Sequence, residues 1–99
     1  ISSITEELAQ KGFFVLASPN PARSGEPVRV ELQIMKKTTL SAALYDAQGR
    51  LVKNIFTHKT FETGVHVESF SAQTHTGAYF LKVTDEKGTN SVVQMSYEE

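Results

Sequence analysis

The sequence predicts an all-β domain, a seven-stranded antiparallel immunoglobulin-like β-sandwich. From Phe13 onward, most segments alternate apolar and polar residues with a period of two, which is typical of half-buried strands. Clusters of turn residues separate these segments at roughly ten-residue spacing, the pattern of a sandwich. With 99 residues, the chain is large enough for one domain with one modest core.

Composition excludes several functional classes. The 10 Lys and Arg residues and 11 Asp and Glu residues are interspersed, so no basic face for nucleic acid or anionic lipid is predicted. No apolar run approaches the roughly 20 residues that span a bilayer, and ISSITEELAQ lacks the basic start and apolar centre of a signal peptide. The absence of cysteine excludes thiolate metal sites, disulfides and cysteine catalysis.

Residues 1–12 are predicted to be a linker or the tail of a preceding domain. Ser3 and Glu6 have capping-box spacing, and Ile4 and Leu8 would share one side of a short helix. Such a helix is marginal without packing partners. The start at Ile1 rather than at methionine indicates a piece of a longer protein.

Two strands open the domain proper, FFVLA at residues 13–17 and VRVELQI at residues 28–34. The second places Val28, Val30, Leu32 and Ile34 on one face. Between the strands, Pro19 and Pro21 restrict φ and push the residues before them towards extended geometry. Pro19, Asn20 and Pro21 are therefore predicted to form a stiff corner that ends the first strand and sets the register of the second.

The middle of the chain predicts a hairpin. TTLSAALYD alternates as a strand, DAQG has the residues of a tight turn, and LVKNIF is the return strand. The apolar positions Val52, Ile55 and Phe56 do not keep one parity, which predicts a bulge or a strand buried on both faces.

The last third predicts three more strands. VHVESFS leaves both parities open, because Val65 and Val67 favour one face and His66 and Phe70 the other. AYFLKVTD places Tyr79, Leu81 and Val83 on one face, and DEKG then turns the chain into the final strand SVVQMSY.

Three of these stretches, taken in order, resemble the C-terminal sorting domain of type IX secretion. They are PNPARSGEPVRVEL, LYDAQGRLV and GAYFLKV, with a glycine beginning the strand at HVESF before the third. The resemblance runs from about Phe13 to Tyr97 and makes residues 13–99 the sorting domain. It implies a non-catalytic signal domain without cofactors, which directs a cargo protein of a Gram-negative bacterium from the periplasm to the cell surface or beyond. It also implies contacts with the secretion translocon, outer-membrane shuttle proteins and a surface sortase that cuts before Phe13 and attaches the cargo to an anchor.

The resemblance also implies site residues. In the family the last strand matters for recognition, which points to Ser91 through Tyr97 here. The implied sorting motifs comprise Pro19, Asn20, Pro21, Tyr45, Asp46, Gly49, Arg50, Val52, Gly77, Tyr79, Leu81 and Val83, and the implied terminal recognition strand comprises Val92, Val93, Gln94 and Met95.

Other functions stay open. The family often ends on a basic and aliphatic strand, whereas this chain ends on Glu98 and Glu99, as a domain retained in a surface component of the machinery would allow. An immunoglobulin-like accessory or scaffold module is the alternative from another class. A carbohydrate-binding module would need an aromatic platform from Tyr45, Tyr79 and Phe80, although buried tyrosine is the commoner use.

The final strand also has a reading from physics alone. If SVVQMSY lies at a sheet edge, its unpaired backbone groups can take up an extended partner or a second copy of the chain; otherwise it is an ordinary covered strand. Tyr45 and Phe80, if they point outward, are the residues that a partner protein would most readily use.

Metal binding and catalysis are not predicted. His58, His66 and His75 lie on three segments with no close-spaced pair. His66 and Glu68 share a strand face and are expected to form a partly buried polar pair. No GxSxG motif is present, and the carboxylates are scattered over turns and solvent faces.

Overall fold

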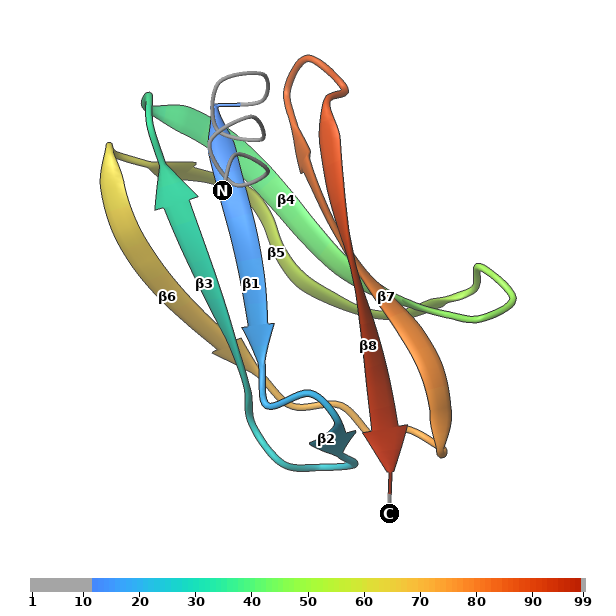
Figure 1. Ribbon diagram of the computed structural model, residues 1–99. Helices are drawn as coiled ribbons and strands as arrows, with labels where there is room; N and C mark the ends of the chain where they lie inside the picture. Colours follow the sequence, from blue (N-terminus) through green and yellow to red (C-terminus); the bar gives the residue numbers. More distant parts are fainter. Residues whose placement is uncertain (1–11, 99) are drawn as a thin grey trace, which may run out of the picture.

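The computed structural model describes residues 12–98, which form two β-sheets (Figure 1). The strands are β1 (Phe13–Ser18), β2 (Ala22–Arg23), β3 (Val28–Ile34), β4 (Thr38–Asp46), β5 (Leu51–Phe61), β6 (Gly64–Phe70), β7 (Gly77–Asp85) and β8 (Asn90–Glu98). Residues 1–11 of the predicted linker lie outside the described part. Within residues 12–98, the search for a helix able to cross a membrane finds none.

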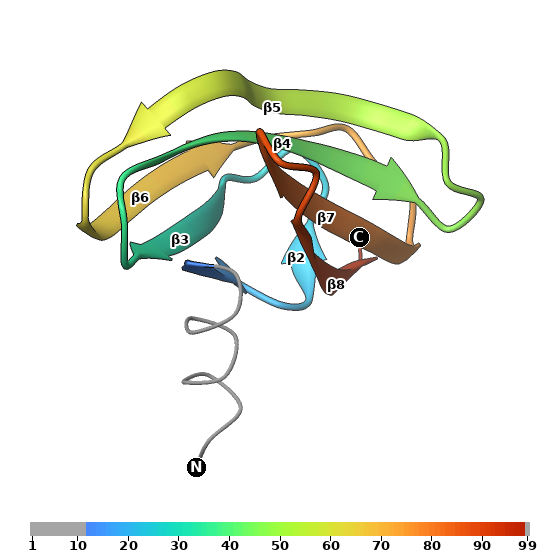
Figure 2. The same cartoon turned by 90° about the horizontal axis from the view of Figure 1, so that it is seen from above.

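The two sheets form two layers, as the view from above shows (Figure 2). One sheet has the strand order β1-β3-β6, and the other has the order β2-β8-β7-β4-β5. The all-β prediction is confirmed. The prediction of seven strands is wrong, because the described part contains eight.

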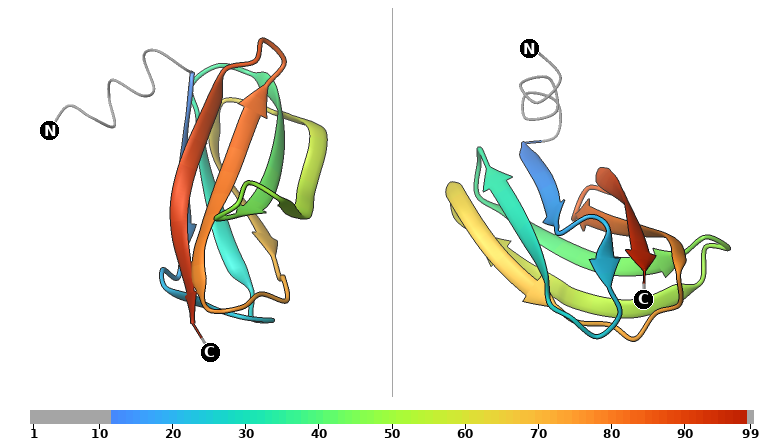
Figure 3. Two further views of the ribbon diagram at one scale, coloured as in Figure 1. Left: turned by 90° about the vertical axis from the view of Figure 1, so that its right-hand side faces the viewer. Right: turned by 60° about the horizontal axis from the view of Figure 1, so that its bottom comes forward.

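The additional strand, β2, also corrects the prediction of a fully antiparallel fold. Ala22 and Arg23 pair with Tyr97 and Glu98 in parallel (Figure 3). The bend at residues 19–21 moves the chain from the edge of the three-stranded sheet to the edge of the five-stranded one. A strand of two residues is too short to produce a periodic pattern, which is why the sequence did not indicate it.

The core lies between the layers and follows the predicted parity of β3 and β7. Leu32 and Leu81 are completely buried from opposite sheets. The predicted apolar faces of both strands belong to this core, which also contains Phe13, Val15, Leu40, Leu44, Met95 and Tyr97. A register slip by one residue would expose either face, so burial fixes the register.

Strand β5 is irregular, as the mixed parity of its apolar residues predicted. Its pairing with β4 shifts register at three places. At one of them Ile55 is the extra residue, and at another it is Val52. Each extra residue reverses the parity, so that Val52, Ile55 and Phe56 all pack against the core. A further irregularity lies near His58, which has a φ of 49° and whose backbone N–H donates to Ser41 Oγ at 3.0 Å.

Strand β6 settles the parity that the sequence left open. Phe70 is buried opposite Val28, whereas Val65 is 65% exposed and Val67 is also exposed on the outer face. Glu68 shares the inward side and stays half-buried, because its carboxylate accepts a hydrogen bond from Lys59 Nζ at 2.7 Å.

Candidate recognition surface

The terminal strand β8 lies near one edge of the five-stranded sheet, and Asn20 covers part of that edge. The backbone N–H of Ser96 donates to Asn20 Oδ1 at 3.0 Å, and Asn20 Nδ2 donates to the carbonyl of Gln94 at 3.3 Å. The amide side chain thus bonds to β8 as a short neighbouring strand would. The predicted entry motif and the predicted recognition strand are in direct contact through this pair of hydrogen bonds.

Towards Val92, the edge of β8 has no paired strand within residues 12–98. Backbone groups of alternate residues face the same way along a strand, so those of Val92 face the edge that Gln94 and Ser96 face. In the part of the chain that the structure describes, β2 pairs only with Tyr97 and Glu98, and no strand pairs with β8 on this side at Val92. Val92 is 53% exposed.

The turn between β4 and β5 is held by the carboxylate of Asp46. Its Oδ1 accepts the backbone N–H groups of Gln48 at 3.0 Å and Arg50 at 2.9 Å, and its Oδ2 accepts Arg50 Nε at 2.9 Å. Gly49 has a φ of 82°, which glycine adopts at little cost. The hydrogen bond from the Arg50 backbone is the largest effect on the Asp46 carboxyl and holds its pKa below the ordinary 3.8, against a smaller opposing effect of desolvation.

The turn between β7 and β8 repeats this geometry. Asp85 Oδ1 accepts the backbone N–H groups of Lys87 and Thr89, each at 2.9 Å, and Gly88 has a φ of 87°. The position that corresponds to Arg50 is Thr89, so this turn lacks the third hydrogen bond that the arginine side chain donates in the β4–β5 turn. The Asp-x-x-Gly sequence therefore stabilises the turn of both hairpins. The β4–β5 turn, which we call the central turn, differs from the β7–β8 turn by the additional hydrogen bond from Arg50.

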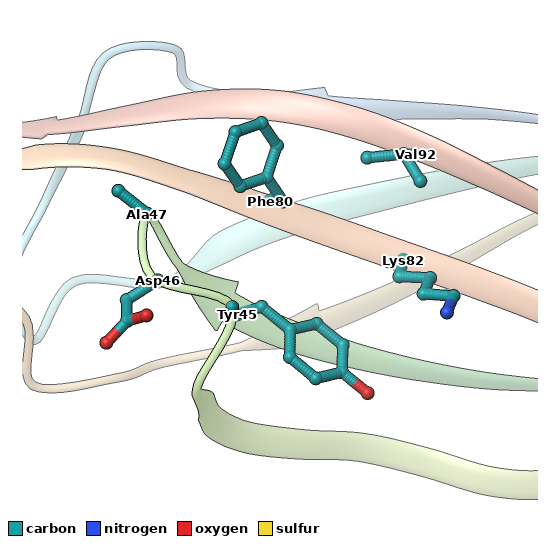
Figure 4. A pocket seen from close by; sticks show the side chains of 7 residues that line it. Tyr45, Asp46, Ala47, Phe80, Lys82 and Val92 are labelled. Carbon is teal, nitrogen blue, oxygen red and sulfur yellow. The ribbon is translucent and has the colours of Figure 1, made fainter.

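Next to the central turn, the outer face of the five-stranded sheet is hollowed. Tyr45 on β4 pairs with Phe80 on β7, and Lys82 on β7 pairs with Val92 on β8. These four side chains line a pocket of about 340 Å³ together with Asp46, Ala47 and Gly49 (Figure 4). We call this feature the outer groove. It joins residues from the central turn, the late strand and the terminal strand at one place.

Comparison with known families identifies the chain. The family described as the secretion system C-terminal sorting domain matches residues 18–95. The chain belongs to this family. The type IX resemblance read from the three motifs is thereby confirmed, and such a domain serves as a signal in export by the type IX machinery. No curated protein matches the sorting domain.

Solved structures show the same fold at low identity. PorZ of Porphyromonas gingivalis, described as an essential bacterial surface component of the type IX secretion system, aligns with a TM-score of 0.57 and 18% identity. The alignment covers 97% of the sorting domain and 12% of the PorZ chain. A β-glucosidase from Listeria innocua aligns with a TM-score of 0.55 and 16% identity over 88% of the sorting domain and 16% of that enzyme. The sorting domain thus corresponds to a small part of each of these proteins.

The implied motif residues divide between the inside and the outside of the sorting domain. Tyr79, Leu81, Val83 and Met95 are buried in the core, and Val52 and Val93 are partly buried against it. Tyr45, Asp46 and Gly49 line the outer groove together with Val92. The implied list omits Lys82, although the alternation in GAYFLKV already places it on the side opposite Leu81.

The buried aromatic residues have contrasting polar environments. The hydroxyl of Tyr79 accepts from the backbone N–H of His75 and donates to its carbonyl, both at 3.0 Å. The ring of Tyr97 packs edge-on against that of Tyr79, with centroids 5.1 Å apart. The Tyr97 hydroxyl is buried without a hydrogen-bond partner among the described residues. Burial is the main cause that raises the pKa of Tyr97 above its ordinary 10.0, and the electrostatic interaction with Tyr79 raises it further. With Tyr79 buried, the aromatic platform of three rings expected for a carbohydrate-binding module does not form.

The histidines have local structural contacts. His66 Nε2 lies 2.7 Å from the carbonyl oxygen of Glu62, and its ring packs edge-on against Phe61. His66 and Glu68 are both half-buried on the inward side of β6, as expected, but they do not bond to each other, since Glu68 bonds to Lys59 instead. Among residues 12–98, no group of three or more His, Asp or Glu side chains could hold a metal ion.

Proposed function

We propose that residues 13–99 act as the signal domain of a cargo protein and direct it across the outer membrane through the type IX secretion system. The match of the sorting-domain family to residues 18–95 carries this proposal. Residues 1–12 then link the signal to a preceding domain. The cargo passes through the periplasm, and a surface sortase cuts before Phe13 and attaches the cargo to the cell surface.

The proposed mechanism is recognition of a folded module. The translocon and outer-membrane shuttle proteins contact the open edge of β8 at Val92 and the outer groove beside it. The motif residues that face the core, such as Leu81 and Met95, contribute by stabilising the fold that presents these two surfaces. The strand order β1-β3-β6 and β2-β8-β7-β4-β5 supports an immunoglobulin-like assignment of the sandwich.

A retained domain of a surface component is the second candidate. The alignment with PorZ over 97% of the chain favours it, because PorZ is itself a surface component of the type IX system. In that case the domain stays attached after export, and the open edge of β8 is also available to a second copy. A non-catalytic accessory or scaffold module, as the alignment with a small part of a β-glucosidase suggests, is the remaining alternative.

The test is a fusion of residues 1–99 to the C-terminus of a periplasmic fluorescent reporter, in a host with the type IX machinery. Reporter at the surface without the domain indicates a cleaved signal, and reporter with the domain indicates a retained one. Reporter confined to the periplasm with a folded domain contradicts the export proposal and favours the accessory module.

Matched variants separate recognition from folding. Deleting residues 92–99 is expected to keep the reporter in the periplasm, but it also removes Met95 and Tyr97 from the core. Val92→Ser changes only an exposed side chain, and Val65→Ser makes the same change on the other sheet. We expect Val92→Ser to lower surface delivery and Val65→Ser to leave it unchanged. Equal delivery of both variants would exclude the Val92 side chain from recognition.

A further inference from the structure

We propose that the outer groove binds an extended segment of a partner protein in which an apolar side chain and a carboxylate are separated by one residue. This inference rests on the proposed function and specifies the chemistry of what recognises the sorting domain. It concerns the face of the five-stranded sheet rather than the edge of β8.

The apolar half of the groove is formed by Tyr45, Phe80 and Val92. These residues come from three neighbouring strands, and Val92 stands about half exposed beside them (Figure 4). The volume of about 340 Å³ is at the lower end of the range for ligand pockets, so it suits one large apolar side chain. Burial of such a side chain removes apolar surface of both partners from water.

The charge of the groove indicates which polar side chain the partner segment carries. Lys82 lies in the groove, and within residues 12–98 its ammonium group has no ion pair or hydrogen bond. Asp46 is the acidic residue of the groove, but three hydrogen bonds within its own turn already occupy its carboxylate. A carboxylate supplied by the partner therefore complements Lys82, and an acidic segment is favoured over a basic or neutral one.

The separation between the apolar side chain and the carboxylate of the partner segment follows from the positions of Phe80 and Lys82 on β7. Phe80 and Lys82 are two residues apart and point to the same side of β7. Alternate side chains of any extended segment are about 6.6 Å apart, since each residue advances roughly 3.3 Å. A segment that lies along β7 can thus place an apolar side chain beside Phe80 and an acidic one beside Lys82. A sugar is disfavoured, because the groove offers few polar side-chain groups. These are the Lys82 ammonium, the Tyr45 hydroxyl and the Asp46 carboxylate, which is already bonded within its own turn.

The test uses nitrogen-15 NMR of the full 99-residue chain with capped pentapeptides. One peptide has the order alanine-leucine-serine-glutamate-alanine, and its control has glutamine in place of glutamate. We expect shifts at the amides of Tyr45, Phe80, Lys82 and Val92, with the acidic peptide binding roughly two- to fivefold more tightly, as expected for an exposed ion pair. Lys82→Gln should abolish this difference.

Lys87→Gln is the matched control, because Lys87 is an exposed lysine in the β7–β8 turn outside the groove. Equal affinities for the two peptides, shifts elsewhere, or no shifts at millimolar peptide would overturn the proposal. Shifts of the groove amides on dilution without peptide would place a second copy in the groove and overturn it too. If peptide binding is as expected but the reporter is not exported, the proposed function fails and the groove assignment stands. If a Lys82→Gln variant loses the preference for the acidic peptide and is still exported normally, that result would show that export does not require recognition of an acidic segment by the groove.

Discussion

Replacing Asn20 with alanine should loosen the end of β8 and destabilise the whole domain. The change removes two hydrogen bonds that join residues 76 and 74 positions apart, those to Ser96 and Gln94. Both lie in an exposed place, so each contributes about 0.5 kcal/mol, at the low end of the usual range. The free energy of unfolding should thus fall by about 1 kcal/mol, which lowers the melting temperature of a domain of this size by roughly 4–8 °C.

The measurement combines thermal unfolding with amide hydrogen exchange at Ser96. In Asn20→Ala, exchange of this amide should accelerate, because its acceptor is removed. Asn20→Asp retains an acceptor for Ser96 but cannot donate to the Gln94 carbonyl, so it should protect Ser96 and still lose part of the stability. Asn54→Ala, an exposed asparagine on β5, is the control and should change little. Unchanged exchange and melting temperature in Asn20→Ala would refute the role of this contact.

Two further predictions concern polar groups of the core and of the turns. Tyr97→Phe should raise the free energy of unfolding by about 1 kcal/mol, because it removes a buried hydroxyl that has no partner among the described residues. Tyr79→Phe should lower the free energy of unfolding by roughly 1–2 kcal/mol, because it removes both hydrogen bonds to His75. Denaturant titrations in which Tyr79→Phe is the more stable variant would contradict this prediction. Asp46→Asn should lower the melting temperature at pH 7, and more than Asp85→Asn does, because the Asp46 carboxylate also accepts an arginine side chain. The folded pKa of Asp46 is lowered, so its contribution is complete above the ordinary value of 3.8 and is lost as the pH falls through the folded pKa. Melting curves between pH 2 and pH 7 should show the difference between wild type and Asp46→Asn shrinking towards low pH, and a constant difference would refute the assignment.

The regular strands were predictable because burial on one face forces a strict alternation. Strand β3 and strand β7 show it without interruption, and the core contains the faces that their sequences indicate. In β6 the apolar residues compete, since Val65 and Val67 are as hydrophobic as the residues of the other face. The pairing with β3 decides, because it puts Phe70 opposite Val28 and leaves both valines outside. That choice depends on register between strands, which one strand's sequence does not contain.

The candidate site was predictable only where it is local. The turn at Asp46 could be read from four consecutive residues, since its hydrogen bonds span at most four positions. The contact between Asn20 and Ser96 crosses 76 positions and depends on the bend that carries β2 to the edge of β8. The outer groove needs the neighbour order β8-β7-β4, which follows from topology rather than from periodicity.

The late strand shows why similarity of motifs does not by itself assign recognition. In GAYFLKV, Tyr79, Leu81 and Val83 face the core, and a change there acts first on stability. Phe80 and Lys82 face the outer groove, and a change there leaves the core intact. A substitution in the inward set that abolishes export therefore reports on folding, because an unfolded domain presents neither the groove nor the edge of β8. Only the outward residues, varied one at a time in a domain shown to be folded, can separate a signal that is read by its surface from one that must merely be stable.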